Sequence, residues 1–146
     1  MAAEIRSLRA QDLAVLDAVA PGVFDDPLDP AATLAFLSDP RHHLVVAIDA
    51  QVVVGFVSAV HYVHPDKPAP EMWINEVGVA ETHQGQGIGT ALIAALLEIA
   101  RRLGCTEAWV LTDRNNERAM RLYRAGGGTA THDHVMFTFR LDRVAT

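Results

Sequence analysis

The sequence predicts an α/β protein of the mixed (α+β) kind, in which a central mixed sheet is covered by helices on both faces. Three observations carry this prediction. Segments with strand patterns are interleaved with segments of helical periodicity along the chain. Half of the residues are apolar, which suits a compact core, and 146 residues is the length of one domain. We therefore expect a single domain over residues 1–146.

The first half of the chain is predicted to hold four strands and two short helices. Leu13 and Leu16 lie at helical spacing before Pro21 and Gly22, which end the first helix, and Pro40 limits the second one. Valine-rich runs then replace the helical period and indicate strands. In order, we expect a strand at 4–8, helices at 11–19 and 31–37, strands at 44–48 and 52–63, a proline-rich loop at 64–70 and a strand at 71–79.

The second half opens with the clearest helix of the sequence. From Ile88 to Leu103 the apolar residues recur at i, i+3, i+4 and i+7, and Gly104 follows as a C-terminal cap. The remaining elements are expected to be a strand at 107–111, a helix at 116–124, a glycine break at 126–128, and a final alternating strand at 135–141 that pairs with one near 129–131.

Composition and charge exclude several classes of protein. No apolar run reaches the roughly 20 residues of a membrane helix, and charged residues near the start do not suit a signal peptide. The lone cysteine, Cys105, excludes an internal disulfide framework, and the dispersed histidines define no metal site. A net charge of −6 argues against nucleic acid. We expect a cytoplasmic protein with no metal and with neither a nucleic-acid nor a membrane partner.

The charge is divided unevenly along the chain. Residues 1–83 hold twelve acids and four bases, whereas residues 84–146 hold six acids and eight arginines. Because summed charge attracts ligands of the opposite sign, the first part suits a cationic partner and the second an anionic one. Uneven solvation of one surface explains the same division without a ligand, and the charges alone do not decide between the two.

A glycine-rich loop leads from the strand at 71–79 directly into the long helix. Glycines let the backbone approach a ligand closely, and a helix N-terminus presents unpaired N–H groups, so this junction is typical of a phosphate site. It lacks the lysine of a Walker A loop, and its glycines are two apart, unlike those of a dinucleotide fingerprint. The loop consists of Gln84, Gly85, Gln86, Gly87, Ile88, Gly89 and Thr90.

Read as Gln-x-x-Gly-x-Gly, the loop resembles the acetyl-CoA pyrophosphate loop of the GNAT superfamily of N-acetyltransferases. Downstream, a helix with the pattern Asn-x-x-Ala-x-x-Leu-Tyr-x-x-x-Gly resembles another motif of that superfamily, although Gly128 stands where a bulky apolar residue is usual. The resemblance implies acetyl-CoA as cosubstrate and a mostly antiparallel sheet that is splayed at the cofactor site. It also implies that acetyl-CoA is bound by the loop together with Val77, Val79, Asn116, Ala119 and Tyr123.

Acetyl transfer to an amine needs a base for the amine and a proton for the departing thiolate. Glu76 precedes the stretch that the resemblance places beside the thioester, and we expect it to act as base, directly or through water, with Glu71 as the reserve candidate. Tyr123 is expected to protonate the thiolate, and the backbone N–H groups near Val77 and Val79 to contact the carbonyl oxygen. Alternatives remain: Glu76 as an ordinary strand carboxylate, Tyr123 as a half-buried tyrosine, and Asn116 as a helix N-cap.

The stretch around Glu71 and Glu76 is similar to the corresponding segment of aminoglycoside 3-N-acetyltransferases within GNAT. That resemblance implies a small cationic amine as acceptor, bound by Asp25 and Asp26 together with Glu71 and Glu76, although Asp25 and Asp26 also suit an Asx-Pro turn that caps the second helix. Two alternatives stay open: an acetyltransferase for a polyamine, an amino acid, a protein N-terminus or a lysine, and a noncatalytic acyl-CoA-binding module. A homodimer is compatible with strands exposed near the C-terminus.

Overall fold

The structure is a computed structural model that describes residues 2–142. Its elements, with η marking a 3-10 helix, are β1 (Glu4–Leu8), η1 (Ala10–Asp17), α1 (Pro30–Ser38), β2 (His42–Asp49), β3 (Val52–His64), β4 (Lys67–Val79), η2 (Glu81–His83), α2 (Ile88–Arg102), β5 (Ala108–Val110) and α3 (Glu117–Ala125).

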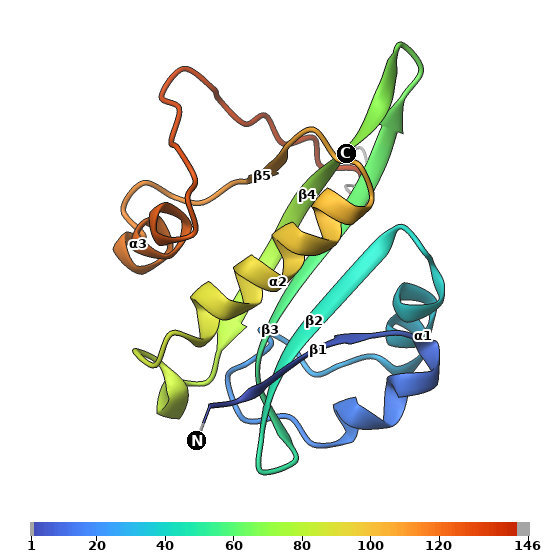
Figure 1. The fold of residues 1–146 in the computed structure, drawn as a ribbon, viewed down its shortest axis with the longest axis vertical. Coiled ribbons are helices and arrows are strands. Elements are labelled where there is room, and N and C mark those ends of the chain that lie inside the picture. The colour runs from blue at the N-terminus through green and yellow to red at the C-terminus, as the bar shows by residue number, and fades with distance from the viewer. Residues whose placement is uncertain (1, 143–146) are drawn as a thin grey trace.

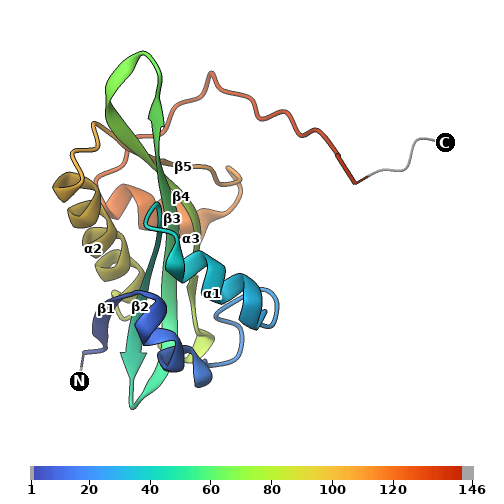
Figure 2. The same cartoon turned by 90° about the vertical axis from the view of Figure 1, so that its right-hand side faces the viewer.

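The five strands form one sheet in the order β1-β2-β3-β4-β5. The first four strands pair antiparallel, and β5 joins β4 in parallel. Helix α2 covers one face, while η1 and α1 lie on the other (Figures 1 and 2). The predicted mixed sheet with helices on both faces is therefore confirmed, and its mostly antiparallel pairing agrees with the family resemblance. The core lies on both faces of β2 and β3, where Val46, Val53 and Val57 are fully buried.

Strands β4 and β5 separate soon after they meet. Their pairing is limited to three positions, which run from Met72 opposite Ala108 to Ile74 opposite Val110. Beyond Ile74, β4 continues to Val79 while the chain after β5 turns toward α3 (Figure 1). The sheet is therefore splayed between β4 and the segment after β5, as the resemblance implies.

The expected proline-rich loop at 64–70 is wrong, because β3 and β4 run through most of it as a long hairpin that projects beyond the sheet (Figure 1). Pro70 O accepts a hydrogen bond from Thr106 N–H on the side away from β3. Pro68 lies two residues earlier on the same side of the strand, so neither missing N–H removes a bond to β3. The prolines thus occupy the edge of β4 at which they cost the sheet least.

The helical predictions hold with one change of type. The segment expected as a helix over 11–19 is the 3-10 helix η1, and Val19 makes an isolated parallel bridge to Val53. Helices α1, α2 and α3 lie where their patterns placed them, within one or two residues. In residues 2–142, no helix combines the length and apolar character that crossing a membrane requires.

The predicted strands at 135–141 and 129–131 are wrong, since residues 126–142 contain no strand. The chain leaves the body of the protein after α3 and extends away from the sheet (Figure 2). An alternation of apolar and polar residues indicates that a segment favours a half-buried strand, but a strand forms only against the edge of a partner strand. Among residues 2–142 the structure places no strand edge beside the segment, so its apolar side chains stay exposed.

Candidate active site

The loop before α2 has the backbone that a bound phosphate needs. Gly85 and Gly87 have φ of 78° and 82°, and a Cβ at either would meet no heavy atom within 4 Å. Conformation rather than space therefore requires glycine at both positions. The first N–H groups of an α-helix lack intrahelical partners, and here Ala91 N–H is the first to bond back, to Gly87 O at 3.0 Å. The open loop and these free donors fit a pyrophosphate.

Gln84 fixes this loop to the end of β4. Its side-chain amide Nε2 donates to Val79 O at 3.1 Å. Ala80 N–H donates to Val54 O in β3, and alternate residues of a strand face the same neighbour. The backbone groups of Val77 and Val79 therefore point away from β3, into the splay beyond β4. The predicted contacts with a thioester require the N–H groups of Val77 and Val79 to point to this side of β4.

A β-bulge decides where Glu76 points. Ile74 pairs with Ala59 and Glu76 pairs with Ser58, so Asn75 is an extra residue in β4. Simple alternation would put Glu76 on the face of Ile74, toward α2. The bulge turns Glu76 to the opposite face, because a single inserted residue reverses the side on which the following residues lie.

The face that Glu76 reaches carries an acidic pocket. The pocket is a hollow of about 300 Å³ lined by Phe24, Asp25, Asp26 and Glu76. Phe24 stacks on Phe56 of β3 with ring centroids 4.0 Å apart, which seats the acidic loop on the sheet. The pocket brings together three of the four residues predicted to bind the acceptor. The helix cap is made instead by Asp29, whose Oδ1 accepts from Ala32 N–H, so Asp25 and Asp26 are not that cap.

Gly78 allows β4 and the Phe24–Asp26 segment to pack closely against each other. A Cβ at Gly78 would lie 2.2 Å from Val23 O and 2.8 Å from a ring atom of Phe56. Any larger residue would therefore push the Phe24–Asp26 segment away from β4. The sequence analysis does not name Phe24, because its partner Phe56 is brought beside it only by the fold.

Helix α3 packs against the start of α2. A Cβ at Gly89 would lie 3.0 Å from Leu122 Cδ1, so glycine allows the two helices to approach. Asn116 is the N-cap of α3, because its side chain accepts from Ala119 N–H at 3.1 Å. Tyr123 is half-buried, and burial raises the pKa of its hydroxyl above the usual 10. The phenol therefore keeps its proton throughout the neutral range, as a proton donor must.

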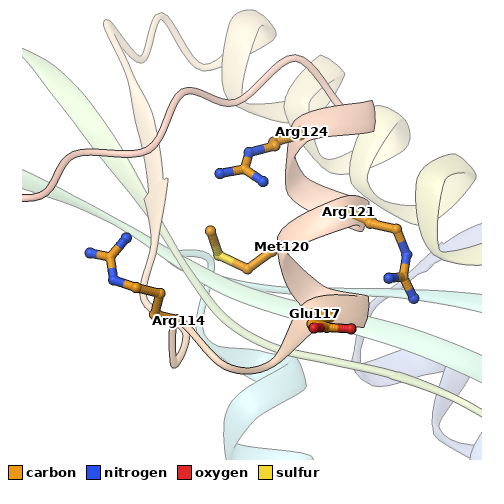
Figure 3. A pocket seen from close by; sticks show the side chains of 5 residues that line it. All are labelled: Arg114, Glu117, Met120, Arg121 and Arg124. Atoms are coloured by element: carbon orange, nitrogen blue, oxygen red, sulfur yellow. The ribbon is translucent and has the colours of Figure 1, made fainter.

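A second pocket lies beside α3 and has the opposite charge. It is lined by Arg114, Glu117, Met120, Arg121 and Arg124. Figure 3 shows Arg114 and Arg124 directed into the same space beside Met120, whereas Arg121 extends from the other flank of the helix. Three guanidinium groups against one carboxylate make this surface suitable for an anion. The sequence analysis counted the arginines of this part of the chain without naming Arg114, which the fold brings beside α3.

Glu71 lies elsewhere, in a hydrogen-bonded group at the far end of β4. Its Oε2 is 2.6 Å from His64 Nε2, and Tyr62 OH donates to its Oε1 at 3.4 Å. Trp109 Nε1 in turn donates to Tyr62 OH at 2.6 Å. Both oxygens of Glu71 thus have partners within the protein, and the structure does not bring this carboxylate into the pocket of Glu76.

The remaining candidate groups do not form a further centre. Among residues 2–142, no group of three or more His, Cys, Asp or Glu side chains could hold a metal ion. His43 is buried and lies 2.8 Å from His61, and burial lowers its pKa to about 4. Burial raises the pKa of the Cys105 thiol, which keeps it protonated and unreactive.

Comparison with known proteins identifies the family. Residues 10–127 match the acetyltransferase (GNAT) family. The chain belongs to the GNAT family. It is 36% identical over 105 residues to the N-alpha-acetyltransferase RimI of Mycobacterium tuberculosis, a match that covers 72% of this chain and 63% of RimI. The chain thus spans less than two thirds of the length of this relative.

The fold resembles several solved structures. One is an aminoglycoside acetyltransferase, meta-AAC0020, from an uncultured soil metagenomic sample, with a TM-score of 0.80, 24% identity, and 95% of this chain and 96% of that chain covered. The structure of the same protein in complex with sisomicin has a TM-score of 0.79. Ribosomal-protein-alanine N-acetyltransferase from Brucella melitensis has a TM-score of 0.75 and 22% identity, with 96% of this chain and 100% of that chain covered. GNAT proteins with different acceptors thus share this fold.

Proposed function

We propose that this protein is an acetyl-CoA-dependent N-acetyltransferase that acetylates a primary amine of a small cationic acceptor, foremost the 3-amino group of an aminoglycoside. The observation that carries the proposal is the bulge at Asn75. It directs the Glu76 carboxylate into an acidic pocket on one face of β4, while the backbone of Val77 and Val79 faces the splay next to the phosphate-binding loop.

The residues of the chain divide the chemistry between them. Acetyl-CoA, when bound, supplies the acetyl group as a thioester. Glu76 takes a proton from the ammonium group of the acceptor, because only a neutral amine is a nucleophile. The N–H groups of Val77 and Val79 donate to the carbonyl oxygen as it gains negative charge. Tyr123 holds the proton that the departing thiolate requires. The loop Gln84–Thr90 and the arginines beside α3 bind the phosphates.

An aminoglycoside suits the charge of the acceptor pocket. Asp25, Asp26 and Glu76 line the pocket with no basic side chain among them. A polycation is attracted to such a surface, and a neutral or anionic amine is not. The likeness to a structure solved with sisomicin supports this choice of acceptor. Acetylation of an aminoglycoside would confer resistance to it, and acetyl-CoA would be drawn from the cytoplasm.

A second acceptor class is favoured by the sequence comparison. The N-alpha-acetyltransferase RimI is 36% identical to this chain over the matched segment. A protein N-terminus is also a primary amine, and the same base and backbone donors would serve it. The acidic pocket would then contact basic residues that follow the N-terminus.

An acceptor panel with acetyl-CoA, read by release of free thiol, tests the proposal. We expect turnover of aminoglycosides and little turnover of peptides with free N-termini. Turnover of peptides alone would establish the second acceptor class in place of the first. Binding of acetyl-CoA without turnover of any amine would identify a noncatalytic module. Expression in a susceptible host should raise the inhibitory concentration of the aminoglycosides that are turned over.

The C-terminal segment supports a homodimer as part of this proposal. Val135, Met136, Phe137, Phe139 and Leu141 are between 72% and 92% exposed. Strand β5 is last in the sheet, so its outer edge is open within residues 2–142. Figure 2 shows the segment leading away from its own sheet. Four of these side chains, those of Val135, Phe137, Phe139 and Leu141, lie on one side of an extended segment, and from two copies they would bury roughly the 1,200 Å² of a stable interface. The segment is therefore suited to extend β5 of a second copy.

Light scattering on the eluted full chain tests the dimer. The wild type should have twice the mass of one chain, and Phe137→Asp should reduce it to a monomer because it buries a charge in the new interface. Thr138→Asp, whose side chain points to the other side of an extended segment, is the matched control and should stay dimeric. A monomeric wild type would overturn this part of the proposal.

A further inference from the structure

A stacked pair of tryptophans lies on the same face of the sheet as Glu76. Trp73 of β4 and Trp109 of β5 have ring centroids 5.2 Å apart and ring planes 8° from parallel. Trp73 pairs with Val60 and Glu76 with Ser58, two residues apart in β3. Alternate residues of a strand share a face, as do cross-strand pairs, so Trp73 and Glu76 lie on one side of the sheet.

Hydrogen bonds on the same face of the sheet hold the stack in place at Trp109. The indole N–H of Trp109 donates to Tyr62 OH, which donates to the Glu71 carboxylate, and His64 holds the other oxygen of Glu71. The four residues come from β3, β4 and β5, so this chain of hydrogen bonds fixes the Trp109 ring across three strands. A rigid aromatic surface loses little conformational entropy when a ligand lies on it.

Trp73 nevertheless remains open to solvent, with 39% of its surface exposed. Trp73 is held by its stacking on the ring of Trp109, which the hydrogen bonds fix. Two acids lie close by in the chain: Glu71, two residues before Trp73, and Glu107 just before β5, whose backbone carbonyl accepts a hydrogen bond from Met72 N–H. A surface with a fixed indole and a negative surround attracts a cation, since an ammonium group over the face of tryptophan is stabilised by the ring.

We propose that the Trp73–Trp109 stack is a second acceptor subsite, which takes an ammonium-bearing ring of the acceptor while the amine to be acetylated lies at Glu76. Because Asn75 is a bulge, Trp73 and Glu76 are separated by only the two positions between Val60 and Ser58 of β3, roughly 7 Å along the sheet. A single-ring amine at Glu76 does not reach the stack, whereas an acceptor of several rings does. The subsite rests on the proposed function and determines which aminoglycosides are preferred.

Comparison of two acceptors isolates the contribution of the subsite. Sisomicin carries aminosugar rings on a central 2-deoxystreptamine ring, and free 2-deoxystreptamine retains the 3-amino group without those rings. For the wild type we expect the KM of sisomicin to be at least tenfold below that of 2-deoxystreptamine. Trp73→Ala should raise the KM of sisomicin roughly tenfold, and leave kcat and the KM values of 2-deoxystreptamine and acetyl-CoA unchanged. The KM of sisomicin for Trp73→Phe should lie between the values for the wild type and for Trp73→Ala.

Controls separate this role from a structural one. Val63→Ala removes another exposed apolar side chain of the same hairpin and should change neither KM. Unchanged turnover of 2-deoxystreptamine by Trp73→Ala reports that the fold and the catalytic residues are intact. Equal KM values for the two acceptors in the wild type, or a Trp73→Ala effect that is the same for both, would overturn the subsite and leave the acetyltransferase standing. Failure of the wild type to acetylate either acceptor would overturn the aminoglycoside proposal itself, before any variant is made.

Discussion

The two pockets of the molecule have opposite charge and are built in different ways. The acidic pocket of Phe24, Asp25, Asp26 and Glu76 is assembled from a loop and a strand that are 50 residues apart in sequence. The arginine pocket comes from α3 and the segment just before it. The bulge in β4 and the stacking of Phe24 on Phe56 position the residues of the acidic pocket, whereas local helical spacing positions those of the arginine pocket.

This difference teaches what the division of charge at Gln84 means. Acids and arginines do not merely predominate in separate halves of the sequence; three of the acids line one pocket and three of the arginines line the other. A transferase that joins an anionic cosubstrate to a cationic acceptor needs two such surfaces, because a single surface would favour one ligand and repel the other. Five substitutions, taken from the largest expected effect to the smallest, test whether the pockets are divided in this way.

Glu76→Gln should have the largest effect, because it removes the base of the acidic pocket. We expect kcat to fall about 10³-fold while the Kd of acetyl-CoA stays unchanged. Steady-state kinetics together with calorimetric titration of acetyl-CoA measure both values. Glu98→Gln, an exposed acid of α2 outside both pockets, should behave as wild type. Full activity of Glu76→Gln would show that another group deprotonates the amine.

Tyr123→Phe should lower kcat by about 10²-fold with little change in acetyl-CoA binding. Burial raises the pKa of Tyr123 above its usual 10, so the hydroxyl loses its proton, and with it any donor role, only at still higher pH. The wild-type rate should therefore show no loss due to this group between pH 7 and 9. Turnover equal to wild type in the variant would remove Tyr123 from the acid role.

Arg124→Gln should weaken acetyl-CoA binding and leave the acceptor KM unchanged. A solvent-exposed ion pair contributes up to about 1 kcal/mol, so we expect about a fivefold rise in Kd. The effect should shrink at high salt, and a short acetyl thioester without phosphates should be used equally well by both proteins. Arg118→Gln is the matched control, since Arg118 lies on the same helix but does not line the pocket. An equal effect of both changes would mean that net charge alone matters.

Asp25→Asn and Asp26→Asn should have the smallest effects, each raising the KM of a cationic acceptor about two- to threefold at low salt. The Kd of acetyl-CoA should not respond. Asp17→Asn, an exposed acid at the end of η1, is the control. The opposite result, a change in acetyl-CoA binding with no change in acceptor KM, would show that the pocket does not serve the acceptor.

Much of this arrangement is predictable from the sequence, for reasons that are local. The glycine turn before α2 and the helix itself follow from glycines and from an unbroken apolar face; the structure confirms the helix and gives Gly85 and Gly87 positive φ. The N-cap role left open for Asn116 was likewise confirmed, because capping depends on neighbours three residues away. The contacts of the loop, Val77, Val79, Ala119 and Tyr123 with acetyl-CoA stay predictions.

The parts that the sequence does not reveal depend on pairing between distant strands. The bulge at Asn75 is visible only once β3 and β4 are in register, since no residue type in that stretch marks it. For the same reason the prolines at 68 and 70 predict a loop where the structure has the β3–β4 hairpin. The alternation at 135–141 was read as a strand, although an edge for it to join is a property of the whole assembly. The Trp73–Trp109 stack likewise needs β5 beside β4.

The bulge at Asn75 also sets how this gene tolerates change. Point substitution of Asn75 alters one exposed side chain, but loss of its codon would shift the parity of every later residue in β4. Glu76 would then turn toward α2 and Val77 toward the acidic pocket, exchanging a buried apolar contact for a buried charge. A single in-frame deletion at this position would therefore abolish both packing and chemistry. Length, more than residue identity, is what this strand must keep.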